Sequence, residues 1–322
     1  MKAAVATEQG LVLREIAQPK PKTNEVLVRV RAAALNRADL AVARGLPHGR
    51  HSGIGATVGL EWAGEVVETG AEVEGYAPGD RVMCSGSGGY AEYAVSDWGR
   101  VNPMPDVMSF EQAATLPVAL ITLHNALLTA GRLRRGERVM IQGASSGVGL
   151  MGLQIAKLMG AELVVGSSTN DARRARLKEF GADLAVDTTR DAWADAVLRA
   201  TDGKGVDLII DQVSASVANE NMRAAAVLGR IVNVGRLGGF KGEFDFDLHA
   251  MKRIDYIGVT FRTRSVEEVR EIVRRTRADL WGDVESGALR LPIDRTFPLD
   301  QAAAALAHMR ANAHFGKIVM TV

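Results

Sequence analysis

The chain has 322 residues, more than one hydrophobic core usually supports, so its length predicts two domains. Hydrophobic residues make up 47% and charged residues 24%, which is typical of a soluble globular protein and excludes a disordered or fibrous chain. The net charge of +1 provides no general attraction to nucleic acid or membranes, and the single cysteine, Cys84, excludes an intrachain disulfide and a multi-cysteine metal site.

The N-terminal segment shows no secretory signal, because it lacks a long apolar stretch followed by small residues and is interrupted early by Glu8. No uncharged apolar run approaches the length that crosses a bilayer, and the nearest is the helix-like stretch 147–159. These two observations predict a cytoplasmic protein.

Short strand-like runs separated by turn residues fill the first third of the chain. Residues 26–30 alternate, residues 64–68 contain β-branched side chains, and residues 80–83 follow a Pro-Gly turn. The pattern predicts a mostly β domain that extends to about residue 119.

From about residue 120 the pattern changes to alternating strands and helices, which predicts an α/β domain over 120–289. Four apolar runs, 139–141, 163–165, 208–210 and 231–234, resemble strands of a parallel sheet buried on both faces. A charged helix is expected from Ser265 toward Gly282, followed by an alanine-rich helix over 299–309 and a closing strand over 316–319. Because both charge signs are mixed in the charged helix, a solvated face explains it better than a nucleic-acid patch.

A glycine-containing loop, 143–149, follows the strand 138–142 and precedes a helix expected over 150–159. This strand-turn-helix context is the one that a dinucleotide loop requires, because small residues admit the pyrophosphate and the helix start attracts its charge. The candidate contacts are Ser145, Ser146, Gly147 and Val148. Taken alone, the loop could also be an ordinary tight turn, but the surrounding βαβ pattern favours the cofactor.

The end of the next strand, 165–169, indicates which dinucleotide is bound. An NAD enzyme normally presents a carboxylate there to the ribose 2′-hydroxyl, whereas this chain has Ser167 and Ser168. Arg173 follows, with Arg174 and Arg176 behind it, and a hydroxyl plus an arginine can bind a 2′-phosphate. The sequence therefore predicts NADPH rather than NADH, although the arginines could also form a solvated helix face.

Five short stretches, in order along almost the whole chain, match the pattern of one family. They are Ala34–Leu40, Gly59–Gly64, Gly79–Val82, Gly88–Tyr93 and Ala311–Val319. Together they resemble the zeta-crystallin-like NADPH:quinone oxidoreductases, a zinc-free branch of the medium-chain dehydrogenase/reductase superfamily.

This resemblance implies a GroES-like, mostly β catalytic domain made of 1–119 and 290–322. Between these two segments it implies a Rossmann domain, 120–289, with a doubly wound parallel sheet, and an active site in the cleft that the domains share. Asn36 and Thr122 would be catalytic and lie near the nicotinamide. The resemblance further implies cofactor contacts from Asn36, Thr122, Ser168, Arg173, Val213, Gly235, Arg236, Phe261, Arg262, Asn312 and Lys317.

The sequence predicts no metal. Zinc alcohol dehydrogenases of the superfamily carry Gly-His-Glu where this chain has Gly59-Leu60-Glu61, and a catalytic zinc needs three protein ligands. His48 and His51 are close in sequence but are interpreted as loop histidines. Tyr90 and Tyr93 are interpreted as packing residues, so no general acid is assigned.

A quinone suits such a site, because it accepts hydride and spreads the resulting charge over its own conjugated oxygen. The alternatives are an enoyl or 2-alkenal reductase, for which Arg262 and Arg264 could steer an acyl-CoA phosphate, and an NADPH-binding protein with little turnover. Some family members have a substrate-pocket tyrosine where this chain has Leu46-Pro47, which leaves the acceptor open. No nucleic-acid or membrane partner is expected.

The resemblance also implies a homodimer that pairs the edges of two Rossmann sheets. The apolar stretch 256–259 is the candidate edge strand, and an internal strand is the alternative.

Overall fold

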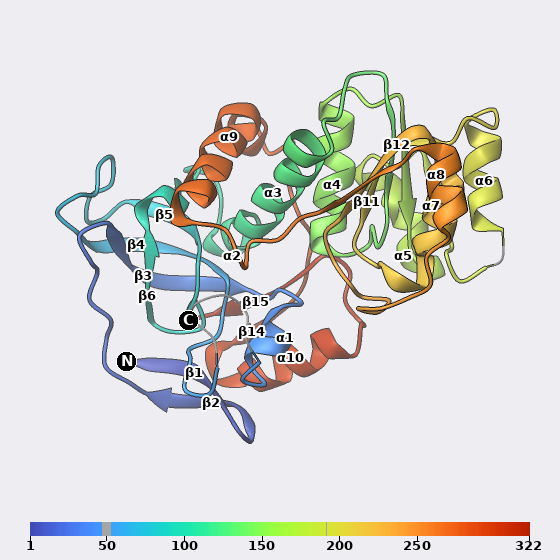
Figure 1. Cartoon of the computed structure of the whole chain (residues 1–322). Coiled ribbons are helices and arrows are strands. Elements are labelled where there is room, and N and C mark those ends of the chain that lie inside the picture. The colour runs from blue at the N-terminus through green and yellow to red at the C-terminus, as the bar shows by residue number, and fades with distance from the viewer. Residues whose placement is uncertain (47–52, 191) are drawn as a thin grey trace. The chain divides into compact units, whose positions relative to one another are not determined.

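The computed structural model describes residues 1–46, 53–190 and 192–322, which form two units (Figure 1). The first unit contains residues 1–121 and 261–322, and the second contains residues 122–260. The β-rich first segment and the C-terminal strand thus share a unit, as the family resemblance implies. Residues 261–289 differ from the expectation, because they belong to the first unit rather than to the Rossmann domain.

The first unit is built on a β-hairpin and a seven-stranded sheet. The hairpin pairs β1 (Lys2–Thr7) with β2 (Gly10–Glu15). The sheet contains β3 (Glu25–Ala34), β4 (Glu61–Thr69), β5 (Arg81–Ser85), β6 (Tyr93–Asp97), β7 (Val101–Pro103), β14 (Ile293–Pro298) and β15 (Lys317–Thr321). Burial alternates over the middle of β3, where Val28 and Val30 enter the core while Arg29 is exposed, whereas Leu27 is buried on the same face as Arg29. Strand β15 pairs antiparallel with β3, which joins the two ends of the chain.

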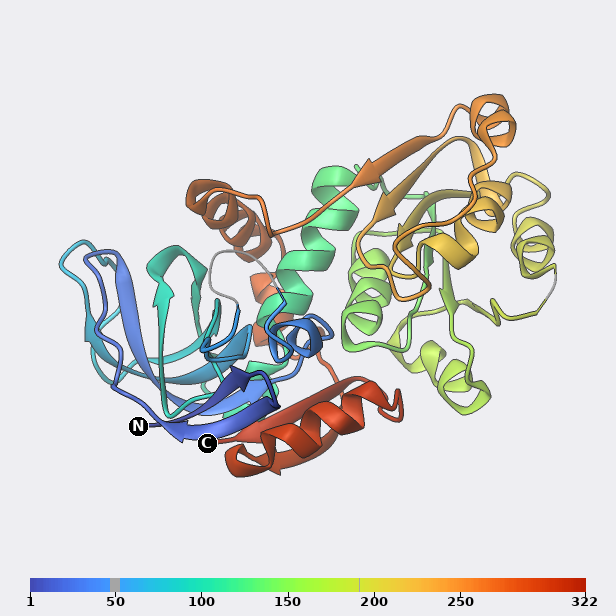
Figure 2. The ribbon, with the colours of Figure 1, turned by 60° about the horizontal axis from the view of Figure 1, so that its bottom comes forward.

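Helices cover parts of this sheet, and α10 lies along β14 and β15 in Figure 2. The helical segments are α1 (Asp39–Val42), η1 (Trp98–Arg100), α2 (Phe110–Ala114), α3 (Pro117–His124), α9 (Val266–Glu285), η5 (Leu299–Gln301) and α10 (Ala302–Arg310). Helix α3 crosses the boundary between the units.

Helix α9 explains why residues 261–289 belong to the first unit. It begins with a capping box between Ser265 and Glu268 and buries Val269, Ile272 and Val273, the stripe expected from the sequence, against Ile121. Its Arg270 pairs with Asp97 at 2.7 Å and lies over the Trp98 ring. The sequence predicts a buried stripe but does not say which sheet or helix it contacts.

One long apolar helical stretch was not identified from the sequence. Residues Phe110–Ala130 form a stretch that is long and apolar enough to cross a membrane by length and composition, but 72% of its most apolar window is buried inside the protein. This burial is typical of a core helix of a soluble protein, so the stretch is weak evidence for a membrane span.

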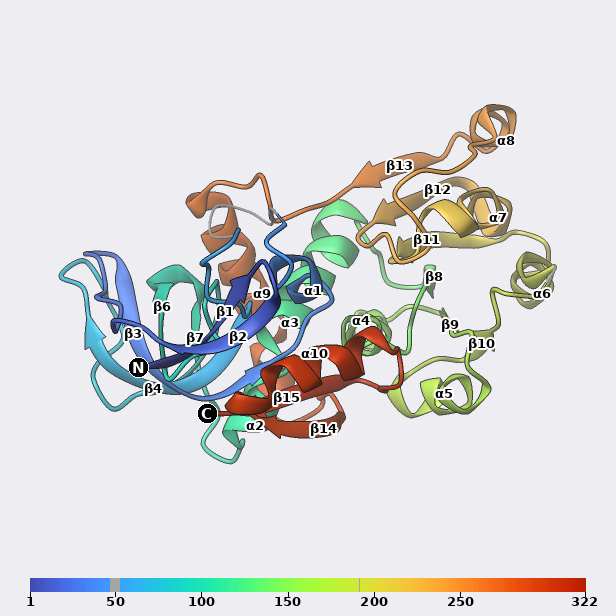
Figure 3. The ribbon, with the colours of Figure 1, turned by 90° about the horizontal axis from the view of Figure 1, so that it is seen from below.

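The second unit contains a six-stranded parallel sheet with the order β10-β9-β8-β11-β12-β13, which can be followed by its labels in Figure 3. The strands are β8 (Arg138–Ile141), β9 (Leu163–Ser167), β10 (Leu184–Val186), β11 (Val206–Asp211), β12 (Ala225–Asn233) and β13 (Asp255–Gly258). This is the Rossmann order, with the switch point between β8 and β11. Strand β13 is an edge strand, so the edge interpretation of 256–259 is confirmed.

Helices connect these strands. They are η2 (Asn125–Ala130), α4 (Gly147–Leu158), α5 (Asp171–Arg176), η3 (Leu177–Phe180), α6 (Trp193–Ala200), η4 (Ala215–Val217), α7 (Ala218–Ala224) and α8 (Phe246–Lys252). Helix α4 begins at Gly147 and not at residue 150, because Ser146 caps it. The end of the glycine loop is therefore the first turn of the helix.

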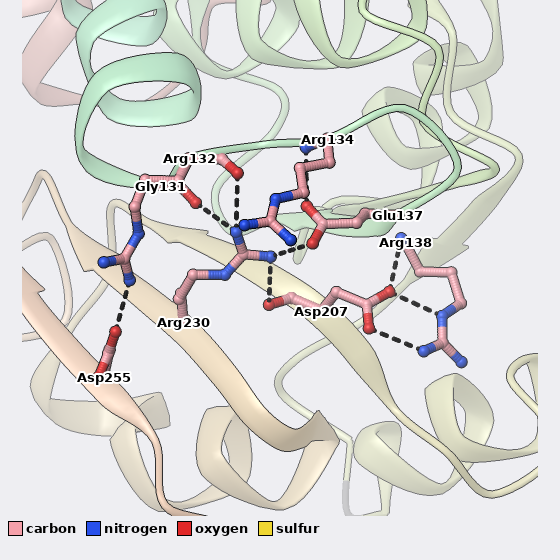
Figure 4. Close-up of polar contacts among 8 residues, drawn as sticks. All are labelled: Gly131, Arg132, Arg134, Glu137, Arg138, Asp207, Arg230 and Asp255. Carbon is pink, nitrogen blue, oxygen red and sulfur yellow. Dashed lines mark hydrogen bonds and ion pairs between the residues drawn. The ribbon is translucent and has the colours of Figure 1, made fainter.

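A charged network lies at the amino-terminal ends of the strands of this parallel sheet, away from the glycine loop that follows the carboxyl end of β8 (Figure 4). Arg230 of β12 is 9% exposed and donates to the carbonyls of Gly131 and Arg132 at 2.7 and 2.9 Å. It also pairs with Glu137 at 2.7 Å. Because the last carbonyls of a helix have no partner within it, this arginine satisfies groups just beyond η2 and holds the end of that helix on the sheet.

Candidate cofactor and active site

The loop between β8 and α4 lies directly against the start of the helix. The Ser146 hydroxyl accepts from the Gly149 N–H at 3.0 Å and contacts the Gly143 carbonyl at 3.0 Å. A Cβ at Gly149 would lie 2.6 Å from the Ala144 Cα and from the Gly143 carbonyl oxygen, so only glycine allows this approach. The loop therefore has the close packing that a dinucleotide loop requires.

Two expected contacts, Gly147 and Val148, are the first residues of α4. The first N–H groups of a helix have no partner within it and carry the positive end of the helix dipole. These N–H groups suit an anionic pyrophosphate, and the residues of the loop fit such a group.

Ser167, at the end of β9, supports the loop from inside the unit. It is 1% exposed, its hydroxyl donates to the Gln142 side chain at 2.6 Å, and it accepts from the Gly143 N–H at 2.9 Å. Gln142 in turn donates to Asn221 at 2.6 Å. Gln212, after β11, donates to the Gln142 carbonyl at 3.1 Å. Since these contacts use its hydroxyl, the structure gives Ser167 a supporting position.

Ser168 lies beside the loop, with its hydroxyl 3.1 Å from that of Ser145. The following arginines differ in their surroundings. Arg174 donates to the Ser168 carbonyl at 2.9 Å and pairs with Asp187 at 3.3 Å, and Arg176 pairs with Glu179 at 3.2 Å. Arg173 follows the Asn170 cap at the start of α5, and its N–H donates to the Asn170 side chain at 3.0 Å.

Val213, Gly235 and Arg236 follow the carboxyl ends of β11 and β12. The buried Asp211 accepts from the N–H groups of Val213 and Ser214 at 2.8 and 2.9 Å, which fixes the first of these turns. A Cβ at Gly235 would lie 2.6 Å from a backbone oxygen of the β11 turn. Beside them is a pocket of about 230 Å³, whose lining includes Ser214, Asn233, Arg236, Lys241, Phe244 and Tyr256.

In the first unit, Asn36 and Lys317 meet in a buried polar cluster. The Asn36 amide donates to Glu61 at 2.8 Å, and the Lys317 ammonium donates to the Asn36 side-chain oxygen at 3.1 Å and to the Leu35 carbonyl at 2.9 Å. Lys317 also forms an ion pair with Glu61, whose other oxygen accepts from the Val118 N–H at 2.8 Å. Both ends of the Asn36 carboxamide are thus held in place.

A second carboxyl group, Asp39, lies next to this cluster. It accepts from the Tyr90 hydroxyl at 2.6 Å and from the Asn36 N–H at 2.7 Å. Burial raises the pKa of Asp39 to about 7, and it also raises the pKa of Glu61, which the Lys317 ammonium opposes. Burial, with the neighbouring Asp39 carboxyl, raises the pKa of the Tyr90 hydroxyl well above its usual value.

The remaining expected residues lie in both units. Asn312 accepts from the guanidinium of Arg37, the residue that follows Asn36 in the sequence, at 2.5 Å. Phe261 packs against the apolar cluster of α9, and Arg262 follows it in the first unit. Thr122 is half-buried on α3 and belongs to the second unit.

The sequence interpretation missed the roles of Glu61, Asp39 and Tyr90 in this cluster. Tyr90 is buried, as expected of a packing residue, but its hydroxyl also binds Asp39, 51 residues away. The spacing of Asp39 three residues after Asn36 is a usable signal, because short acidic side chains often close such turns.

Among the described residues, no three His, Cys, Asp or Glu side chains gather in a way that could hold a metal ion. Cys84 is buried. Pro47, His48 and His51 lie outside the described residues, so the interpretations that involve them are not tested.

Two family models match the chain, "Zinc-binding dehydrogenase" over residues 147–277 and "Alcohol dehydrogenase GroES-like domain" over residues 22–106. The structure resembles that of an NAD-dependent alcohol dehydrogenase, with a TM-score of 0.85, 30% sequence identity and 100% of both chains covered. The chain belongs to the medium-chain dehydrogenase/reductase superfamily. It is an oxidoreductase of the α/β fold class, with a GroES-like domain and a Rossmann-type sheet.

Two relatives of this chain are different classes of protein, a quinone oxidoreductase and a subunit of a polyketide synthase. The chain is 28% identical to a quinone oxidoreductase of Rattus norvegicus over 309 residues, which are 95% of this chain and 92% of the relative. It is 30% identical to a phenolphthiocerol/phthiocerol polyketide synthase subunit of Mycobacterium tuberculosis over 97% of this chain. The chain spans only 14% of the length of that synthase subunit.

Proposed function

We propose that this oxidoreductase transfers hydride from NADPH to a quinone without a metal ion. The observation that carries the NADPH assignment is the end of β9, where Ser167 and Ser168 stand in place of a carboxylate and the Ser168 hydroxyl lies 3.1 Å from that of Ser145. Because neither serine carries a negative charge, these two side chains would not repel a 2′-phosphate as a carboxylate would. The quinone assignment is supported by the rat quinone oxidoreductase, which matches over most of its length.

Bound NADPH would supply the hydride from C4 of its nicotinamide ring. The chain would hold the pyrophosphate with the N–H groups of Gly147 and Val148, and the 2′-phosphate with Ser168 and Arg173. In this proposal Asn36 and Thr122 contact the nicotinamide, and the network of Lys317 and Glu61 keeps the Asn36 carboxamide in one orientation. The rate effect would come mainly from holding the two reactants at near-attack distance.

A second candidate is reduction of the carbon–carbon double bond of an enoyl or 2-alkenal substrate. It is supported by the match to the polyketide synthase subunit, which covers 97% of this chain. A third candidate is a protein that binds NADPH with little turnover.

A panel of acceptors separates these candidates. NADPH and NADH oxidation would be measured with 1,4-benzoquinone, 9,10-phenanthrenequinone, trans-2-hexenal and an unsaturated acyl thioester, before and after treatment with a chelator. The proposal expects NADPH-selective turnover of quinones that the chelator leaves unchanged. Turnover of the alkenal or thioester alone would assign a double-bond reductase, and binding without turnover would favour the third candidate.

The choice of cofactor can be tested at Arg173. Replacing it with alanine should weaken NADPH binding about 10-fold, because a charge-assisted hydrogen bond to the 2′-phosphate is lost, and should leave NADH binding unchanged. Arg176→Ala is the control, since that side chain pairs with Glu179. Dissociation constants from fluorescence titration check this, and equal losses for both cofactors would contradict the phosphate role.

We further propose that the chain forms a homodimer through β13. This strand is at the edge of the sheet, and Phe246, an apolar side chain near it, is 75% exposed. A groove beside the strand is lined by Phe244, Tyr256 and Ile257, among others. Light scattering should give twice the chain mass, and Ile257→Lys should shift it to that of a monomer. A monomeric wild-type protein would contradict the proposal.

A further inference from the structure

Asp39 is a buried acid that neither the expected cofactor contacts nor the quinone chemistry uses. It starts α1, is fully buried, and closes a turn with Asn36 from both sides. One carboxyl oxygen accepts from the Asn36 N–H at 2.7 Å, while the Asp39 N–H donates to the Asn36 carbonyl at 2.9 Å. The backbone position of Asn36 therefore depends on Asp39.

Tyr90 holds the same carboxyl oxygen from the segment between β5 and β6. Its hydroxyl donates to Asp39 Oδ2 at 2.6 Å, and its ring is fully buried. The other oxygen, Oδ1, is buried and has no hydrogen-bond partner among the described residues. An ionised carboxylate with one oxygen unsolvated is costly, so the surroundings favour the neutral acid.

Two charged side chains, on β4 and on β15, face Asp39. Glu61 on β4 opposes ionisation of Asp39, and Lys317 on β15 favours it, but the Lys317 ammonium is already paired with Glu61. Burial outweighs the three effects that favour ionisation, which are the hydrogen bonds from the Tyr90 hydroxyl and the Asn36 N–H and the charge of Lys317, and it brings the pKa of Asp39 to about 7. Asp39 therefore changes its charge near neutral pH.

A change in the charge of Asp39 affects how Lys317 and Glu61 hold the Asn36 side chain. Lys317 binds Asn36 and Glu61, so a second carboxylate nearby competes for its ammonium. With Asp39 neutral, Glu61 and Lys317 form a balanced pair and Asn36 keeps both of its side-chain contacts. With Asp39 ionised, the cluster carries an excess negative charge that nothing in it balances.

We propose that Asp39 and Tyr90 are a positioning pair for Asn36, and that acceptor reduction is fastest while Asp39 keeps its proton. The inference rests on the proposed function, because it gives Asn36 a place beside the nicotinamide. Neither residue is assigned contact with cofactor or acceptor.

The test compares the wild type with Asp39→Asn, Tyr90→Phe and the control Tyr93→Phe, using the acceptor that gives turnover. From about pH 6 to about pH 8, the wild-type kcat should fall about 10-fold, as expected for one unit beyond a pKa near 7, with little change in KM for NADPH. Asp39→Asn cannot ionise, so its kcat should not change over this range. Tyr90→Phe removes a hydrogen bond that favours the ionised acid, so its fall should move to higher pH. Tyr93→Phe should follow the wild type.

A second measurement does not need turnover. An acid whose pKa is raised in the folded state contributes stability below its unfolded pKa and loses it as the pH rises through the folded pKa. The urea midpoint of Asp39→Asn should therefore rise relative to that of the wild type between about pH 5 and about pH 8. Parallel midpoints, or parallel kcat profiles, would overturn the proposal. If no acceptor is turned over, the proposed function fails, while the midpoints still decide whether Asp39 holds its proton.

Discussion

Replacing Lys317 with methionine should lower the free energy of unfolding by about 3–5 kcal/mol, because it leaves the carboxylate of Glu61 buried without its charge partner. The side chains of Lys317 and Glu61 are 4% and 0% exposed, so water cannot take the place of the ammonium. Burial already raises the pKa of Glu61, and losing Lys317 should raise it further. The loss of stability should therefore be larger at about pH 8 than at about pH 5.

Two further variants complete this test. Adding Glu61→Gln to Lys317→Met should recover part of the lost stability, because the uncompensated charge is removed. Lys157→Met is the matched control, since Lys157 pairs with Asp183 on a partly exposed surface. Denaturation in urea at the two pH values measures all three. A Lys317→Met variant as stable as the Lys157→Met control would show that the buried ion pair does not hold the cluster.

Replacing Gly149 with alanine should reduce the affinity for NADPH by about 10-fold or more. A 10-fold loss of affinity corresponds to a binding free energy weaker by about 1.4 kcal/mol. The new Cβ would lie 2.6 Å from the Ala144 Cα and the Gly143 carbonyl oxygen, so the loop must move away from the start of α4. Overpacking of this kind typically costs about 1–3 kcal/mol, and here it displaces the N–H groups expected to bind the pyrophosphate.

Gly282→Ala is the control for this variant. Gly282 is also helical, and a Cβ there has no atom within 4 Å, so alanine should leave NADPH binding unchanged and slightly stabilise α9. Calorimetric titration with NADPH measures the affinity of both variants. Unchanged affinity of Gly149→Ala would contradict the placement of the cofactor at this loop.

Local sequence patterns predicted the sheet of the second unit. The apolar runs 139–141, 163–165 and 208–210 lie in β8, β9 and β11, because strands buried on both faces need continuous β-branched and aliphatic side chains. The edge position of β13 could only be proposed, since order in a sheet depends on pairing between distant segments.

Boundaries and partners were harder to predict. The helix α4 begins at Gly147 although glycine disfavours helices, because the Ser146 cap and the contact with the loop compensate. The buried stripe of α9 was visible, but the division that places residues 261–289 with the first unit follows from contacts with Ile121 and Asp97.

The candidate site also contains residues that a local motif reveals and residues that only the fold brings together. The loop 143–149 and the Ser167-Ser168 pair follow each other along strands and could be found by motif. The cluster of Asn36, Glu61, Tyr90 and Lys317 brings together four distant segments, and a contact between Asn36 and Lys317 across 281 residues has no local signature. The family resemblance named two of these residues, and the structure shows how the others hold them.

The proposed function depends on direct transfer of hydride from NADPH to a conjugated acceptor. Its most direct test is NADPH oxidation by the chelator-treated protein with 9,10-phenanthrenequinone, comparing NADPH that carries hydrogen with NADPH that carries deuterium at C4. We expect NADPH-dependent turnover that survives the chelator and is slower with deuterium at the transferred position. No oxidation despite tight NADPH binding, or activity that disappears with the chelator and returns with zinc, would contradict it.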